Sequence, residues 1–364
     1  MNERERLLAV LAGNTPDKTP WYADLSYLYT SMQIRGVLDE KYYGDEGYLQ
    51  FHKDLGAGIC FYAPFPWKTE YNGGVQYSQA EEGGIRTCSY VTPVGSLTSV
   101  YKYLPTTYTW AMNEHFVNSI EDLRTMLYIF EHTRYFKNYD EFKGTDALWA
   151  ESGIAVAFPP VSASTVQKLF ARWAGVENTV RIYADDMEEF DEIVERIQAS
   201  EDEAFNILAD SPAPVIEFAE NLSSEITGKY FFEKYHQDYY QKRIKQLHAA
   251  GKYASIHIDG TLKGCLPLLE HAGFDAAEAV TPAPIGDIEI EDLRKWSGDR
   301  IVIWGGLPGA LFSPLYSEEE FENHLERVFR TFPVGSRFVL GVADQVPPDG
   351  LISRVKRVRE FIGD

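Results

Sequence analysis

The chain has 364 residues, with 34 basic and 55 acidic side chains and a formal net charge of −21. This negative charge repels nucleic-acid phosphates and anionic lipid head groups, so we expect partners among small molecules and other proteins. No apolar run approaches the roughly 20 residues that cross a bilayer, which argues against membrane insertion. The length suits one large α/β barrel, and we expect residues 1–364 to form a single domain.

Cysteine usage and the N-terminus indicate the compartment. The three cysteines, Cys60, Cys88 and Cys265, form no closely spaced pair. The opening stretch MNERERLLAVLAGN is charged where a signal peptide would need an apolar run. We therefore expect a reduced, cytoplasmic protein without disulfides.

The first 120 residues are rich in aromatic side chains and irregular in pattern. Trp21 and Tyr22 are candidates for stacking against a flat substrate, with packing in the core as the alternative. Residues 72–104 predict antiparallel hairpins that precede the barrel or are inserted into it. The sequence EEGG at 81–84 is expected to form one of the turns.

From residue 153 onward, short β-rich runs alternate with helical stretches. We expect strands within 153–160, 214–223, 253–260, 274–282, 300–308 and 336–350. Helices are expected within 187–198, 228–251, 261–273, 287–298, 317–333 and 351–363. Repeated strand–helix units imply parallel strands with crossover helices. They favour a closed (β/α)8 TIM barrel, and no strand is followed by the glycine-rich fingerprint of a dinucleotide-binding sheet.

Three of these helices carry specific signatures. Ser317 lies three residues before Glu320, which is the spacing of a capping box. The other two helices have apolar stripes, formed by Phe190, Ile193, Val194 and Ile197 and by Leu351, Val355, Val358 and Ile362.

Polar residues follow several expected strands, where a barrel of this type places its active site. They are Glu220 and Asn221, His257 and Asp259, Glu278 and Thr281, and Asp344. Because the ends of parallel strands meet at one rim, we expect these side chains to converge there.

Each of these residues also has a structural alternative. His257 could be a core histidine, Asp259 a helix cap and Asp344 a turn residue. His236, on an expected helix, could be an ordinary surface histidine. Glu278 is unusual because an unpartnered carboxylate in a buried strand is costly, so we expect a ligand or cation beside it.

Four stretches resemble the uroporphyrinogen decarboxylase superfamily. They are ERERLLAVLAGNTPDKTPW, YVTPVGSL, YYQKRIKQLHAAGKYASIHIDG and GVADQVPPD. The resemblance implies one barrel of this type with an irregular N-terminal hairpin region. One branch of the superfamily decarboxylates porphyrinogens without a cofactor, and another comprises zinc-dependent methyltransferases that act with a corrinoid protein. The arginine-rich N-terminal motif of the decarboxylases is missing, since WYADLSYLYTS carries Asp24 and aromatic residues in its place.

The methyltransferase branch is the better match. HIDG takes the place of its H-x-C-G zinc motif, and Asp344 falls where a distant cysteine would be. His257 matches, whereas Asp259 and Asp344 replace sulfur with oxygen, which argues against activation of a thiol. The spacing pattern of substrate-demethylating members falls on Asn221, His236 and His257, but the residue type agrees only at His257.

The resemblance implies a reaction and a set of site residues. A methyl group would pass from a small methylated substrate, such as an aryl methyl ether, to cobalamin carried by a partner corrinoid protein, with zinc activating the substrate. The implied roles are zinc ligands (His236, His257, Asp259), catalytic groups (Glu278, Asp344) and substrate contacts (Trp21, Tyr22, Asp24, Asn221).

Other readings remain open from the sequence. They are a decarboxylase-like lyase, a barrel hydrolase that uses Glu278 and Asp344 as paired carboxylates, and a non-catalytic barrel that binds a corrinoid or a tetrapyrrole. A homodimer is also open.

Overall fold

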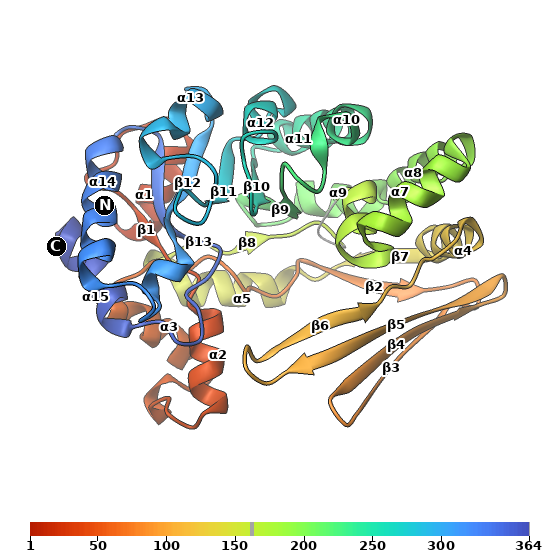
Figure 1. Ribbon diagram of the computed structural model, residues 1–364, viewed down its shortest axis with the longest axis horizontal. Helices are drawn as coiled ribbons and strands as arrows, with labels where there is room; N and C mark the ends of the chain where they lie inside the picture. Colours follow the sequence, from red (N-terminus) through yellow and green to blue (C-terminus); the bar gives the residue numbers. More distant parts are fainter. Residues whose placement is uncertain (161–163, 364) are drawn as a thin grey trace.

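The computed structural model describes residues 1–160 and 164–363. Its centre is a curled sheet of seven parallel strands in the order β1-β13-β12-β11-β10-β9-β8 (Figure 1). The strands are β1 (Trp21–Tyr22), β8 (Val156–Ala157), β9 (Val215–Leu222), β10 (Tyr253–Ile258), β11 (Ala276–Val280), β12 (Val302–Pro308) and β13 (Phe338–Ala343). All the strands expected from residue 153 onward are therefore confirmed, although β8 is short.

A short extended segment, residues 58–60, lies between the two edge strands of this sheet. The Gly58 N–H donates to the Trp21 carbonyl at 2.8 Å, and the Ile154 N–H donates to the Ile59 carbonyl at 3.0 Å. Isolated parallel bridges pair Tyr22 with Gly58 and Ile59 with Gly153. The parallel sheet is thus TIM-barrel-like, with its two edges linked by bridges rather than by a full eighth strand.

Helices surround the sheet and connect its strands. They include α1 (Glu3–Leu11), α2 (Ser26–Ile34), α3 (Gly44–Leu55), α5 (Tyr139–Trp149), α9 (Asp202–Asp210), α12 (Leu266–Ala272), α13 (Leu293–Ser297), α14 (Glu318–Thr331) and α15 (Ile352–Ile362). Short helical turns occur at η1 (Glu40–Tyr42), η2 (Ala150–Ser152), η5 (Ile290–Asp292) and η6 (Gly309–Phe312). The predicted capping box of Ser317 and Glu320 is confirmed at the start of α14.

Two helical stretches contain a π turn. The helix expected over 228–251 consists of α10 (Gly228–Phe231), the π turn η4 (Phe232–His236) and α11 (Gln237–Ala249). The other stretch consists of α6 (Thr165–Lys168) and the π turn η3 (Leu169–Trp173). Such turns add a residue to the helix and redirect side chains, and they are frequent near functional sites.

An antiparallel region projects to one side of the parallel sheet (Figure 1). It contains the pair β2 (Trp67–Tyr71) and β7 (Thr133–Lys137), and the four-stranded sheet β3 (Gln76–Glu82), β4 (Ile85–Thr92), β5 (Gly95–Leu104) and β6 (Thr109–Glu114). The expected hairpins are therefore confirmed. Gly83 and Gly84, both at positive φ, form the two-residue turn between β3 and β4.

The antiparallel region and the parallel sheet have different apolar clusters. Side chains of β4 and β5 pack with α4 (Ile120–Glu131), α7 (Gly175–Asp185) and α8 (Met187–Ser200). The expected stripe of α8 is buried in this cluster. Inside the parallel sheet, Val215, Val302 and Val339, near the starts of their strands, pack against Leu7 and Val10 of α1. Helix α1 thus covers the end of the sheet where the strands begin.

The described residues contain no helix that combines the length and the apolar character needed to span a membrane.

Candidate active site

The inward faces of the central strands change character along their length. Val215, near the start of β9, belongs to the apolar cluster beside α1, whereas Glu217, Ala219 and Asn221 on the same face of β9 line a cavity. On β11, Ala276 is apolar and Glu278, two residues later, lines the cavity. Side chains two residues apart on a strand share a face. The site therefore lies on the inner face of the curled sheet, toward the C-terminal ends of its strands.

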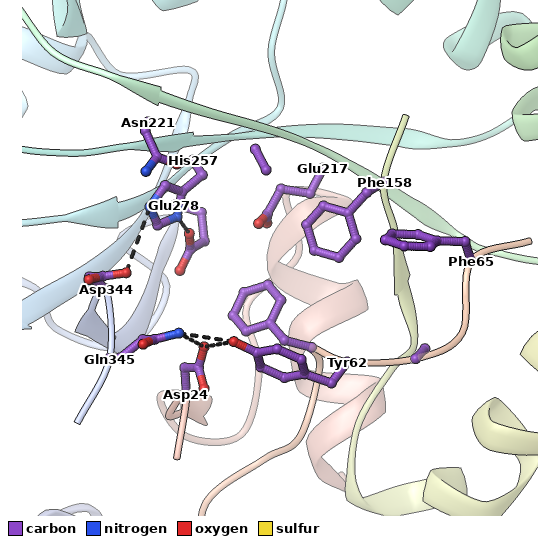
Figure 2. A pocket seen from close by; sticks show the side chains of 13 residues that line it. Asp24, Tyr62, Phe65, Phe158, Glu217, Asn221, His257, Glu278, Asp344 and Gln345 are labelled. Atoms are coloured by element: carbon purple, nitrogen blue, oxygen red, sulfur yellow. Dashed lines mark hydrogen bonds and ion pairs between the residues drawn. The ribbon is translucent and has the colours of Figure 1, made fainter. Parts of the chain in front are cut away.

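Strand register brings three of these polar side chains together. Ser255 of β10 is paired with Glu217 of β9, and His257 of β10 is paired with Glu278 of β11. The Ser255 hydroxyl donates to Glu217 Oε2 at 3.0 Å, and His257 Nδ1 lies 2.6 Å from Glu278 Oε2. On the other side of the ring, His257 Nε2 lies 3.9 Å from Asp344 Oδ1. Figure 2 shows Glu217, His257, Glu278 and Asp344 along one side of the cavity.

The cavity has a volume of about 500 Å³ and two kinds of wall. Its polar lining includes four carboxyl groups and His257. Its apolar lining is mainly aromatic. The residues are Asp24, Phe61, Tyr62, Ala63, Phe65, Phe158, Glu217, Ala219, Asn221, His257, Glu278, Asp344 and Gln345. The structure thus brings Asn221, His257, Glu278 and Asp344 into one cavity, as the strand-end pattern predicts, and Asp24 lines the same cavity.

Burial and mutual charge shift the pKa values of the central groups. Burial opposes a charge on the imidazole, but the adjoining Glu278 carboxylate outweighs it and raises the pKa of His257 to about 10. Burial raises the pKa of Glu278, and His257 counteracts part of this rise. Burial and the nearby Glu278 raise the pKa of Glu217 well above its ordinary value. Without a bound cation, the His257 imidazole and the Glu278 carboxylate therefore stabilise each other's charge, and burial favours the protonated form of Glu217.

Asp24 occupies the opposite side of the cavity. Its Oδ2 accepts hydrogen bonds from Gln345 Nε2 at 3.0 Å and from the Tyr62 hydroxyl at 3.4 Å, and its Oδ1 accepts from the Ser26 N–H at 2.9 Å. Burial raises the pKa of Asp24, while the bonds from Ser26 and Gln345 lower it. Gln345 also donates to the Tyr62 hydroxyl at 2.9 Å, so one amide links both groups.

Backbone strain is concentrated at this cavity. Seven non-glycine residues of the described chain have positive φ, and three of them, Tyr62, Asn221 and Asp344, line the cavity. A fourth, Ala279 at φ 60°, directly follows Glu278. Such conformations cost of order 1–3 kcal/mol each and cluster at functional sites. The concentration supports this cavity as the active site.

Glu217, His257 and Glu278 also have the composition of a cation site. One possible ligand atom from each residue lies within 4.8 Å of those of the other two. Among the described residues, these three form the group of histidine and acidic side chains that is close enough to share a metal ion. Glu217 and Glu278 are both 2% exposed. Each keeps one oxygen, Oε1, without a hydrogen-bond partner in the part of the chain that the structure describes. A shared cation would neutralise two buried carboxylates, and one nitrogen with two oxygens is a donor set that suits zinc.

His236 does not join this group, contrary to the expected zinc set. Its ring is fully buried and its Nδ1 lies 2.7 Å from the Ser164 hydroxyl. That hydroxyl also donates to Glu220 Oε2 at 3.1 Å, so Glu220 points away from the central cavity. The π turn η4 places His236 against Tyr240, with the two rings stacked at 15°. Burial lowers the pKa of His236 to about 3 and raises that of Glu220 to about 7.

Asp259, Trp21 and Tyr22 also lie away from their expected positions. Asp259 is exposed, and its Oδ1 accepts a hydrogen bond from the next residue's N–H at 2.7 Å, which is a turn contact. Trp21 and Tyr22 are buried in apolar clusters, and the Tyr22 hydroxyl donates to the Glu3 carbonyl. Neither aromatic side chain lines the cavity, whose described aromatic residues come instead from 61–65 and 158. Trp21 and Tyr22 are therefore core residues, as their structural alternative has it. Asp259 is a turn residue and does not cap the next helix, whose N-cap is Cys265.

Several cavity residues were missed from the sequence. Glu217 has the same signature as Glu278, an acid inside a buried strand, and it shares a strand face with Asn221. That alternation could have identified it. Tyr62 and Gln345 follow irregular backbone, so no periodic pattern marks them.

Comparisons with known proteins point to one family. The family model described as uroporphyrinogen decarboxylase (URO-D) matches residues 168–364, slightly more than half of the chain. A search among curated proteins finds no match. Among solved structures, a methyltransferase from Methanosarcina mazei has a TM-score of 0.61 at 13% identity, and the match covers 99% of this chain and 98% of that one. At this identity the likeness shows a shared fold.

Proposed function

We propose that this chain, which belongs to the uroporphyrinogen decarboxylase family, moves a methyl group from a small methylated substrate to a corrinoid protein. The observation that carries the proposal is the buried group of Glu217, His257 and Glu278 at the base of a cavity large enough for a small organic molecule. The overall fold shared with a methyltransferase is in keeping with it.

The cavity argues against the decarboxylase activity after which the family is described. A porphyrinogen carries many carboxylates, which need basic partners. Four carboxyl groups line this cavity, and no lysine or arginine of the described chain does so. The carboxylates of a porphyrinogen bound in the cavity would be repelled by the carboxyl groups that line it, so a polycarboxylate substrate would be disfavoured.

Glu217, His257 and Glu278 would hold zinc. Bound zinc would supply a Lewis acid that polarises the substrate atom to which the methyl group is attached. The cobalamin of the partner would supply the nucleophile. The chain's own residues would position the substrate between the zinc and the cobalamin.

Three of the chain's residues would orient the substrate and handle protons. Asp344, at the exposed edge of the site, would donate a proton to the leaving group, because partial burial raises its pKa even though His257 counteracts part of the rise. Asn221 and Asp24 would contact the polar part of the substrate. The Ser255 hydroxyl holds Glu217 in position by its hydrogen bond.

The test combines metal analysis with a methyl-transfer assay. Purified protein should contain about one zinc per chain and should methylate free cob(I)alamin from a suitable donor, followed by the corrinoid absorption spectrum. His257→Ala and Glu217→Gln should lose both properties. His236→Ala, which removes a buried histidine outside the group, is the matched control and should keep the metal. A zinc-free protein that cleaves a glycoside would instead support the hydrolase reading.

A further inference from the structure

The charge of the cavity limits what it can bind. Asp24, Glu217, Glu278 and Asp344 contribute four carboxyl groups, and His257 is the one residue that can carry positive charge among the described lining residues. Zinc held by Glu217 and Glu278 would neutralise those two carboxylates and leave Asp24 and Asp344. An excess of negative charge therefore remains with or without the metal, and it favours a cationic ligand.

Aromatic rings form the wall of the cavity away from His257. The rings of Phe61 and Phe158 have centroids 6.4 Å apart, and those of Phe158 and Phe65 are 6.3 Å apart with their planes at 87°. Tyr62 lies next to them and its hydroxyl points to Asp24. Figure 2 shows Phe158, Phe65 and Tyr62 around one part of the cavity, with Asp24 at its edge. Differently tilted rings beside a carboxylate are the groups that recognise quaternary ammonium ions.

The structure also shows unsatisfied acceptors directed into the cavity. Glu217 is buried, and its Oε1 lacks a hydrogen-bond partner among residues 1–160 and 164–363. The same holds for Oε1 of Glu278. Neither oxygen is among the fully enclosed polar atoms that lack a partner, so both open into the cavity, where water or a ligand can reach them. A cation in the cavity would meet two carboxyl oxygens that have no other hydrogen-bond partner in the described chain.

We infer that the methyl donor is a methylated ammonium cation, with its methyl groups against Phe61, Tyr62 and Phe158 and its charge near Asp24. This inference rests on the proposed methyl-transfer function and names its substrate class. Transfer would break one N–CH3 bond and leave the electron pair on nitrogen, which gives a neutral amine. The methyl group would pass to the nucleophilic cobalt(I) of the partner. An ammonium nitrogen has no lone pair for zinc, so for this donor class the positive charge on nitrogen would take the place of Lewis-acid activation of the leaving group. The departing amine needs no proton, so Asp344 would act here through its charge.

The first test compares two ligands of nearly identical shape. Choline carries a trimethylammonium group, and 3,3-dimethylbutan-1-ol carries the neutral tert-butyl group in its place. We expect calorimetric titration of the full, zinc-loaded chain to show choline binding about tenfold more tightly, which is the scale of a cation–aromatic contact supported by a carboxylate. Equal binding of the two, or binding of the neutral alcohol alone, would overturn the inference.

Variants locate the binding to this wall. Asp24→Asn and Phe158→Leu should each weaken choline binding severalfold and change the binding of the neutral alcohol much less. Tyr62→Leu offers a second aromatic change at an exposed position, should one of the buried variants fail to fold. Asp299→Asn is the matched control, since Asp299 is an exposed acid in the loop before β12, and it should leave choline binding unchanged.

A methylation assay separates this inference from the proposed function. Free cob(I)alamin is offered choline or methoxybenzene as the methyl donor. Tight choline binding without methylation from either donor would retain the cation site and reject methyl transfer. Methylation from methoxybenzene without any preference for choline would retain methyl transfer and reject the ammonium substrate.

Discussion

His257 Nδ1 lies 2.6 Å from Glu278 Oε2, across a register pair that joins β10 to β11. Because this contact outweighs burial in setting the charge of the imidazole, Glu278→Gln should lower the pKa of His257 from about 10 to below its ordinary value of 6.5. Titration of the imidazole resonance by NMR in metal-free protein measures the pKa of His257. Asp344→Asn is the control and should change the value much less, because Asp344 is the weaker and more distant partner. An unaltered pKa in Glu278→Gln would contradict the ion pair.

Zinc binding should depend on pH with a defined sign. Metal binding requires a neutral imidazole, and His257 stays protonated up to a pH of about 10 in the metal-free protein. Zinc must therefore displace the His257 proton, and Glu217, whose pKa burial also raises, must lose its proton to bind the metal. The apparent affinity should rise about a hundredfold per pH unit where both protons are released. Competition with a chromogenic chelator between about pH 6 and about pH 9 checks this, since metal-linked proton release sets the slope. A flat profile would mean that His257 is not a ligand.

His52 should make the fold sensitive to acid. Burial lowers the pKa of His52, on α3, to about 4, and its Nδ1 donates to the Gly58 carbonyl at 3.2 Å. The unfolded chain then binds more protons than the folded chain below pH 6.5, so the free energy of unfolding falls as the pH falls from about 6.5 to about 4. The loss from this group should be about 2 kcal/mol at about pH 5.

Urea unfolding of wild type and His52→Asn at about pH 7 and about pH 5 measures that loss. The asparagine amide keeps a donor near the Gly58 carbonyl and cannot be protonated, so the variant should be less sensitive to acid. His271→Asn changes an exposed histidine and should retain the wild-type difference. If the free energy of unfolding depends on pH identically in wild type and His52→Asn, then His52 does not take up a proton when the protein unfolds.

Gly153 is required where the two edges of the parallel sheet meet. A Cβ at this position would lie 1.8 Å from the Ile59 carbonyl oxygen, which accepts the Ile154 N–H. Gly153→Ala should therefore lower the free energy of unfolding by about 2 kcal/mol or more. Gly144→Ala, in the nearby helix α5, is the matched control, since no atom lies within 4 Å of its added Cβ. That change should stabilise the protein by about 0.5–1 kcal/mol, as alanine does inside helices. Chemical unfolding of both variants decides whether the bridge between Ile59 and Gly153 contributes to stability.

Much of the architecture could be predicted from the sequence because its causes are local. The stripe of Phe190 and Ile193, the capping box at Ser317 and the paired glycines at 83–84 each depend on residues within one or two turns of chain. Likewise, a polar residue at the end of an apolar strand marks the rim of a barrel. His257, Glu278 and Asp344 were found in this way, and all three line one cavity.

The partners of these residues were decided by tertiary structure. The register between β9 and β10 places Glu217 near His257, and the π turn before α11 directs His236 elsewhere. The spacing of residues along the chain does not directly encode either feature. The family resemblance implied a zinc set that includes His236 and His257, but the fold turns His236 to Ser164. The sequence by itself determined which segments form strands and helices and which strand ends carry chemistry, because hydrophobic periodicity acts within a segment. Only the packed structure decided which side chains share a site, because contacts between distant segments depend on the registry of the whole sheet.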